Sequence, residues 1–192
     1  ALSLEHENKE LRSLLNYKPE PTLSFISARV IANAGSAYVQ SLIVTSGHID
    51  GVKVGMAAMT GEGLVGRVVE VGDWTSRILL ITDLNSRIPV MITGSRDQAI
   101  LAGDNNMQPK LLYLPHDTSL QVGARVLTSG HGGIFPPNLP VGVVAKSGPK
   151  ETRIAPIASI GKINQIRLID FGLKAGDFNP MTAKIKSKKT SR

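Results

Sequence analysis

The chain has 192 residues and no cysteine, which excludes disulfide bonds and thiolate metal sites but leaves the redox compartment open. Its net charge of +7 arises from 22 basic and 15 acidic residues. Five basic residues and no acidic ones lie between 181 and 192, so the remainder holds 22 − 5 = 17 basic residues against 15 acidic ones. No basic stretch interleaves aromatic residues as a base-stacking surface would, so nucleic-acid binding is not indicated.

The first segment predicts a coiled-coil helix over residues 1–18. Apolar residues and one asparagine recur at alternating spacings of four and three, which places them on the seam of a two-stranded coil: Leu4, Asn8, Leu11 and Leu15. An asparagine on that seam can pair with its counterpart and fix the register, so we expect a homodimer. A lone amphipathic helix packed on its own domain is the alternative. Lys18-Pro19-Glu20-Pro21 ends the helix.

The residues that follow predict a mainly β fold. Short β-branched runs alternate with Gly, Asn, Asp and Pro at spacings typical of barrels or sandwiches, and glycines beside strands favour barrels. We expect a first β-barrel domain over 22–95, a second over 96–172 whose last strand may return to the first, and a basic tail over 173–192. The expected strands lie near Ser27–Ala32, Ala37–Thr45, Leu64–Val71, Arg77–Thr82, Pro89–Thr93, Ala99–Ala102, Lys110–Leu114, Arg125–Thr128, Gly142–Lys146, Ile154–Ile160 and Gln165–Asp170.

An internal repeat supports two similar domains. The phrase Val-Gly-x-x-x-x-Thr occurs over 54–60 and again over 122–128, and each copy is followed by a second Val-Gly pair at 65–66 or 141–142. The second copy carries eight extra residues before that pair, because 14 residues separate Thr128 from Gly142 and six separate Thr60 from Gly66. A repeat of this length suits two small β domains better than a solenoid.

The stretch from Thr128 to Gly133 is the best candidate for catalysis. A serine beside glycines can act as a nucleophile, with a histidine as base and an aspartate to orient it: Ser129, then His48 or His116, then Asp50, Asp83 or Asp117. Ser129, however, occupies the place of Gly61 in the first copy, which favours a turn residue. The four histidines (His6, His48, His116, His131) lack metal-ligand spacing, so we expect no metal site. We likewise expect no catalytic or cofactor site.

Two features suggest a partner-binding or self-association surface. The loop at 134–140 concentrates apolar residues and is stiffened by three prolines, and such a loop loses little entropy on docking. A loop folded over its own barrel end is the alternative. The single tryptophan lies in a Gly-Asp-Trp-Thr turn and could anchor a partner or plug a barrel. The candidate surface is therefore Trp74, Ile134, Phe135, Pro136 and Pro137.

Three stretches resemble the extracytoplasmic region of the bacterial rod shape-determining family MreC. They run over residues 63–68 (GLVGRV), 80–90 (LITDLNSRIPV) and 128–142, which includes Phe-Pro-Pro-Asn-Leu-Pro-Val-Gly. With the leading helix, the likeness covers residues 1 to about 171. The basic tail matches nothing in the family pattern, and a solvated terminus or a binder of anionic polymers remain its two interpretations.

The resemblance implies two six-stranded barrels, similar to the chymotrypsin arrangement without its catalytic groups, behind a coiled coil. It implies a periplasmic region of a single-pass inner-membrane protein whose transmembrane helix lies upstream. It also implies a non-enzymatic elongasome scaffold that self-associates, binds the class B penicillin-binding transpeptidase, and associates with MreD, RodA and the MreB system. A two-barrel serine hydrolase with Ser129 as nucleophile is the alternative.

The coiled-coil prediction can be tested at its one polar seam position. Replacing Asn8 by valine removes the register-specifying pair, so Asn8→Val is expected to change the oligomeric state or register. Sedimentation velocity measures the change, and Asn16→Val, one position beyond the seam residue Leu15, is the matched control. Identical sedimentation of Asn8→Val and the parent chain would count against the seam.

Overall fold

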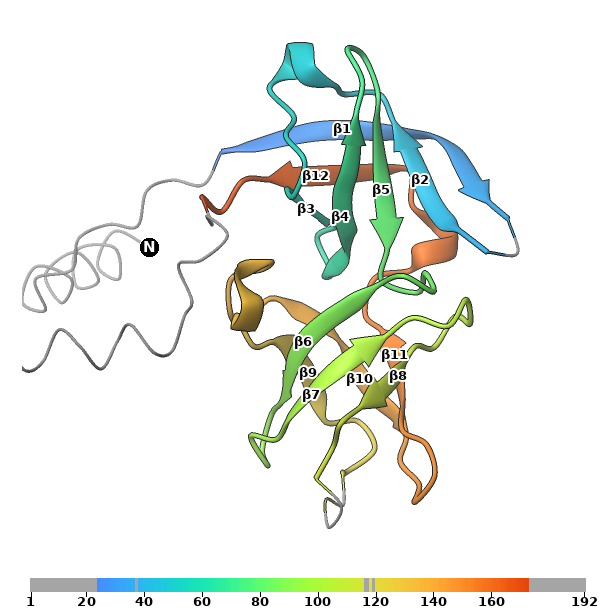
Figure 1. Cartoon of the computed structure of the whole chain (residues 1–192), viewed down its shortest axis with the longest axis vertical. Coiled ribbons are helices and arrows are strands. Elements are labelled where there is room, and N and C mark those ends of the chain that lie inside the picture. The colour runs from blue at the N-terminus through green and yellow to red at the C-terminus, as the bar shows by residue number, and fades with distance from the viewer. Residues whose placement is uncertain (1–23, 37, 116–117, 119, 173–192) are drawn as a thin grey trace, which may run out of the picture.

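A computed structural model describes residues 24–36, 38–115, 118 and 120–172. These residues form two closed six-stranded antiparallel barrels stacked along the long axis of the molecule (Figure 1), so the two-barrel prediction is confirmed. The described helical turns are short 3-10 segments: η1 (His48–Asp50), η2 (His131–Gly133) and η3 (Ile160–Lys162). None of the described helices has the length and apolar character needed to cross a membrane. The expected coiled coil and basic tail lie outside the described residues.

The first barrel combines five strands from the start of the described chain with one strand from its end. Its members are β1 (Phe25–Gly35), β2 (Gln40–Val44), β3 (Ala57–Met59), β4 (Leu64–Val71), β5 (Ser76–Leu80) and β12 (Gln165–Ile169). They close in the order β1-β12-β3-β4-β5-β2. The last strand thus returns to the first barrel, and it joins β1 through a register that places Phe25 opposite Ile169.

The second barrel is continuous in sequence. It consists of β6 (Arg87–Ile92), β7 (Gln98–Ala102), β8 (Lys110–Leu112), β9 (Arg125–Thr128), β10 (Pro140–Lys146) and β11 (Arg153–Pro156), closed in the order β10-β11-β8-β7-β6-β9. β6 lies between β7 and β9 as β12 lies between β1 and β3. The two barrels therefore share one strand arrangement, with the opening strand of the first supplied from the far end of the chain.

The expected domain boundary at 95 and 96 is wrong, because it falls inside a hairpin of the second barrel. β6 pairs with β7 (Val90 opposite Ala99), and the expected boundary lies in the Gly-Ser-Arg-Asp turn between them. The chain crosses between the barrels instead at the segment 81–86, from β5 to β6, and returns at 157–164, from β11 to β12. Turn residues mark a change of direction equally well inside a domain and between domains.

The sequence repeat corresponds to a shared local structure. Gly55 and Gly123 both adopt left-handed backbone (φ 94° and 90°), which glycine adopts far more readily than residues with a side chain. Their N–H groups donate to the carbonyl oxygens of Val68 (2.9 Å) and Val144 (2.7 Å), respectively. The same turn thus leads into β3 in one copy and β9 in the other.

The second glycine of each repeat permits close contact between neighbouring strands. A Cβ on Gly66 would overlap the Leu79 carbonyl oxygen of β5, and one on Gly142 would overlap the Ala155 carbonyl oxygen of β11. A side chain at either position would force two paired strands of a small barrel apart.

A buried polar network joins the barrels at the segment 81–86. The Asp83 side chain has no exposed surface, and its two oxygens accept hydrogen bonds from the backbone N–H groups of Gln40 (2.5 Å) and Asn85 (2.7 Å). The Gln40 side chain accepts from Thr82 Oγ1 and donates to the Asn105 carbonyl oxygen (2.9 Å). Gln40 begins β2, whereas Asn105 follows β7, so the network connects both barrels to the linker.

Apolar contacts complete the interface. A Cβ on Gly63, in the turn between β3 and β4, would overlap the Ile157 side chain and lie 2.8 Å from the Pro140 carbonyl oxygen of the second barrel. The buried apolar residues of both barrels form one continuous cluster. The barrels therefore pack against each other as one body rather than as independent domains.

The close strand contact at Gly66 gives a stability prediction. Gly66→Ala is expected to lower the free energy of unfolding by about 1–3 kcal/mol, as overpacking does, and the melting temperature by roughly 2–4 °C per kcal/mol. Gly61→Ala is the matched control, because a Cβ there meets nothing within 4 Å. Thermal unfolding of both variants followed by circular dichroism tests the point. Equal melting temperatures for the two would refute it.

Candidate partner-binding groove between the barrels

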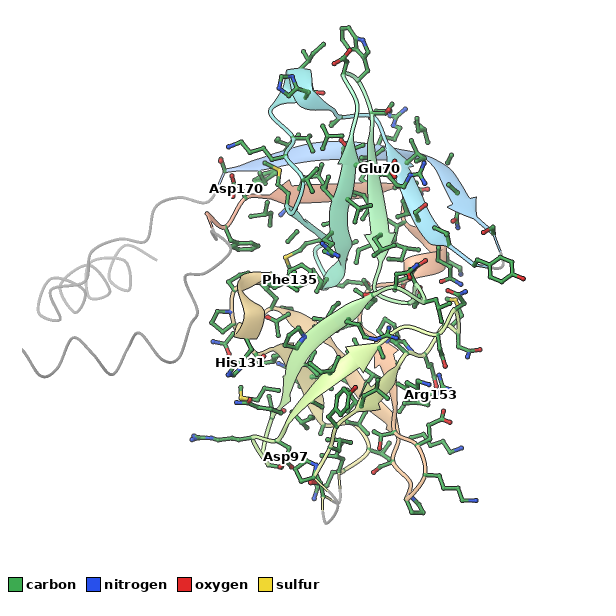
Figure 2. The ribbon with its side chains drawn as sticks, in the orientation of Figure 1. Glu70, Asp97, His131, Phe135, Arg153 and Asp170 are labelled. Atoms are coloured by element: carbon green, nitrogen blue, oxygen red, sulfur yellow. The ribbon has the colours of Figure 1, made fainter. Side chains whose placement is uncertain are left out.

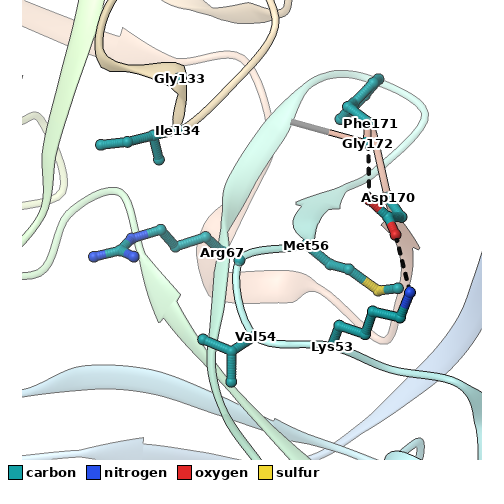
Figure 3. A pocket seen from close by; sticks show the side chains of 10 residues that line it. Lys53, Val54, Met56, Arg67, Gly133, Ile134, Asp170, Phe171 and Gly172 are labelled. Atoms are coloured by element: carbon teal, nitrogen blue, oxygen red, sulfur yellow. Dashed lines mark hydrogen bonds and ion pairs between the residues drawn. The ribbon is translucent and has the colours of Figure 1, made fainter. Parts of the chain in front are cut away.

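An open groove of about 520 Å³ lies where the two barrels meet (Figure 3). The first barrel contributes the turn at 53–56 and Arg67 of β4. The segment 170–172, which leaves β12, lines it as well. The second barrel contributes Gly133 and Ile134 from the loop between β9 and β10. The groove therefore exists only while the barrels hold their relative position.

Backbone geometry fixes the apolar residues of the groove. Val54 immediately precedes the left-handed Gly55 and is 63% exposed, because the turn directs it away from the barrel core. Ile134 follows Gly132 and Gly133, both with positive φ (77° and 66°), and is 37% exposed. Met56, which also lines the groove, is buried. These residues give the groove apolar walls on both sides.

The charged groups of the groove are available to a ligand. Lys53 Nζ lies 3.6 Å from Asp170 Oδ2, but both side chains are well exposed, so the pair contributes at most about 1 kcal/mol. Arg67 is half-buried on β4, and no carboxylate in the described part of the chain lies within salt-bridge distance of it. A half-buried guanidinium without a carboxylate partner favours an incoming carboxylate or carbonyl oxygen.

Arg153, on β11, shows the contrasting case of a saturated arginine. It hydrogen-bonds Glu151, Asp104 (2.7 Å) and the Gln108 carbonyl oxygen. The hydrogen bond to Glu151 raises the pKa of Arg153 against partial desolvation. Burial alone would raise the pKa of Asp104, but hydrogen bonds from Arg153 and Asn106 hold it below its ordinary value. The guanidinium of Arg153 is thus engaged within the second barrel, whereas that of Arg67 has no carboxylate partner in the described chain.

Phe135 does not belong to an exposed surface, contrary to the sequence prediction. It is only 3% exposed and packs in the common core (Figure 2). The loop folds back because Thr128 Oγ1 donates to the Pro136 carbonyl oxygen (2.6 Å) and accepts from Leu139 N–H (2.9 Å). That closure drives the aromatic ring inward, where burial of a large apolar side chain is stabilising. The alternative of a loop folded over its own barrel is thus the correct one for Phe135.

The other members of the candidate surface are separated in space. Pro136 is half-buried and Pro137 exposed, on the same loop as Ile134. Trp74 is 71% exposed in the turn between β4 and β5, at the end of the first barrel that points away from the second (Figure 1). Only Ile134 lines the groove. Trp74 and Ile134 cannot belong to one compact contact.

The geometry gives little support to a catalytic triad. Ser129 Oγ lies 3.1 Å from His131 Nδ1, two residues along the same exposed loop, rather than beside His48. Asp50 accepts from Gly47 N–H, and Asp83 is occupied in the linker. No carboxylate is hydrogen-bonded to His131 among the residues that the structure describes, and His116 and Asp117 lie outside them. The serine hydrolase alternative is therefore not favoured.

Sequence reasoning missed the charged groove residues. Arg67 stands out only as the single charged residue in the otherwise apolar run from Leu64 to Val69, and its function depends on which face of β4 it occupies. Lys53 and Asp170 are far apart in sequence and meet because β12 returns to β3. No local sequence pattern could therefore predict the contact between Lys53 and Asp170.

The structure thus defines a protein of two packed six-stranded barrels with an open groove between them. The family model for "Rod shape-determining protein MreC, barrel core" matches residues 30–170. The chain belongs to the MreC family.

Relatives and solved structures agree with this assignment. The chain is 40% identical over 169 residues to the cell shape-determining protein MreC of Cereibacter sphaeroides (88% of this chain, 56% of that protein) and 38% identical over 171 residues to that of Caulobacter vibrioides (89% and 49%). It spans about half the length of the curated relatives it matches. The crystal structure of MreC from Pseudomonas aeruginosa is similar with a TM-score of 0.72 and 28% identity, covering 77% of this chain and 99% of that one.

A further solved structure is similar in fold alone. It is the complex between penicillin-binding protein PBP2 and MreC from Helicobacter pylori, with a TM-score of 0.58 and 13% identity over 76% of this chain and 97% of that one.

Proposed function

We propose that this chain is the extracytoplasmic part of a non-enzymatic scaffold for lateral cell-wall synthesis. In this proposal the region lies in the periplasm behind an upstream transmembrane helix. It self-associates through the seam of Leu4, Asn8, Leu11 and Leu15, and it works with MreD, RodA and the MreB system. Its principal ligand is the class B penicillin-binding transpeptidase. Membership of a cell shape-determining family supports the role, and the Helicobacter pylori complex supports the kind of partner.

The observation that carries the proposal is the groove between the joined barrels. It combines apolar residues on two walls with a half-buried arginine that has no carboxylate partner in the described chain. An extended or helical segment that presents an aliphatic side chain beside a carboxylate or free carbonyl would satisfy both features. Because the buried network at Asp83 already fixes the walls, docking loses little conformational entropy.

The mechanism that we infer is selection of one partner conformation. A ligand shifts an equilibrium only by its differential affinity for the two states, so the scaffold must bind the active transpeptidase more tightly than the inactive one. A factor of 100 in affinity corresponds to about 2.7 kcal/mol. A single buried apolar contact with one charge-assisted hydrogen bond is of that order.

The repeat supplies a matched pair of variants for testing the groove. Val54 and Val122 precede equivalent left-handed glycines and are similarly exposed (63% and 69%), but only Val54 lines the groove. Val54→Asp is expected to weaken binding of the purified transpeptidase ectodomain at least tenfold, because it places a charge on an apolar wall. Val122→Asp should bind within about twofold of the parent chain. Biolayer interferometry at fixed salt measures both.

A second pair of variants separates the groove from the distal turn. Ile134→Asp should weaken transpeptidase binding as Val54→Asp does, whereas the fold remains intact because the side chain is partly exposed. Phe135→Asp is unsuitable for this purpose, since it would place a charge in the core. If Trp74→Asp weakens binding and both groove variants do not, the contact lies at the β4–β5 turn and the groove assignment is wrong.

A further inference from the structure

The outer end of β1 is an open strand edge. β1 pairs with β12 over residues 25–29, and Val30 N–H donates to the Asn164 carbonyl oxygen (2.9 Å) as the last bond on that side. Beyond that point β1 continues to Gly35 and pairs only with β2. Figure 1 shows this end of β1 projecting past β12. A closed barrel thus carries a short β1–β2 ribbon with one unpaired side.

The hydrogen-bond alternation identifies which backbone groups are free. Ser36 N–H donates to the Val39 carbonyl oxygen, and the ladder has no register shift from Ala32 to Gly35. In an antiparallel ladder, the backbone N–H and C=O groups of residues 36, 34 and 32 therefore all point toward β2. Asn33 and Gly35 therefore direct their N–H and C=O groups outward. No described backbone group bonds them there. The register shift between Val30 and Ala32 bends the ribbon away from the barrel at this point.

The edge lacks the features that usually prevent pairing. Natural edge strands are protected by charges, prolines or covering segments. Between Val30 and Ile49 the sequence holds no Asp, Glu, Lys, Arg or Pro, although the whole chain has a net charge of +7. Ile31 is 54% exposed beside the free edge. Two copies can therefore approach along this edge without bringing like charges of the edge itself together.

We propose that this edge pairs with the same edge of a second copy of the chain. In an antiparallel, two-fold arrangement Asn33 lies opposite Gly35 of the second copy, and Gly35 opposite its Asn33. Each of these two opposed pairs exchanges two N–H···O=C bonds, so the contact forms four backbone hydrogen bonds. Ala34 lies on the two-fold axis, opposite its own counterpart. The proposal is independent of the groove and would link copies that the seam at 1–18 has already brought together.

The contact is short, so it depends on local concentration. Four backbone hydrogen bonds with little apolar burial give a weak interface, well below the size of a stable isolated dimer. Copies tethered in pairs meet at an effective concentration of order millimolar, which allows a weak contact to form. Within such a tethered pair, the edge contact would relate the two copies by a two-fold axis.

The absence of cysteine in the chain permits a direct test by crosslinking. A disulfide requires Cα atoms within about 7 Å, and the proposed register brings residue 34 next to residue 34 of the second copy. Ala34→Cys in the whole 192-residue chain is expected to form a disulfide-linked dimer at least tenfold faster under mild oxidation than Ala32→Cys. The control lies on the same strand and face, but its counterpart would be about 13 Å away, four residues along. Non-reducing electrophoresis over time measures both rates.

Backbone variants test the hydrogen bonds themselves. Asn33→Pro removes an outward N–H that the fold does not use, whereas Asn33→Ala keeps it. In the Ala34→Cys background, proline should slow dimer formation at least tenfold and alanine should leave it within twofold. Equal rates for Ala34→Cys and Ala32→Cys would overturn the proposal, as would equal rates for folded Asn33→Pro and Asn33→Ala. Should the proline variant unfold, the comparison of the two cysteine variants decides alone.

Discussion

A fully buried carboxylate holds the two barrels in one arrangement. Transfer of a charged group from water is costly unless its hydrogen bonds are replaced, and Asp83 replaces them with the N–H groups of Gln40 and Asn85. Gln40 opens a strand of the first barrel, and its side chain reaches the loop after β7 in the second. Since the groove takes one wall from each barrel, its shape depends on this joint. The apolar contact of Gly63 with Ile157 supports the joint from the other side.

The two copies of the repeat differ where the barrels face each other. Thr60 closes a tight turn by accepting from Gly63 N–H (3.3 Å), and that turn packs against the second barrel. Thr128 plays the same part at the base of a longer loop, accepting from Leu139 N–H. The eight additional residues place Ile134 in the groove and Phe135 in the core. The longer loop thus supplies the part of the groove lining that comes from the second barrel, Gly133 and Ile134.

Sequence patterns predicted the barrels but not their boundaries or surface. β3 was missed because Ala57–Met59 lacks β-branched residues, although its repeat partner Arg125–Thr128 was predicted as a strand. Phe135 was predicted at the surface because the composition of a loop does not reveal which way its side chains point. Here the left-handed glycines and the hydrogen bond of the Thr128 hydroxyl set the path of the loop and thus the direction of Phe135. The groove charges come together only through the return of β12. Local patterns therefore predicted elements well and long-range juxtapositions poorly.

The rigidity of the joint is the claim on which the groove depends, and spin-label distances measure it directly. Cysteines introduced at Lys53 and His131 would carry one label on the first barrel and one on the loop of the second. The account predicts a single narrow distance distribution in the parent background and with the exposed Asp73→Ala, and a broad one with Asp83→Ala, which cannot accept the two N–H bonds. An equally narrow distribution in a folded Asp83→Ala protein would contradict it.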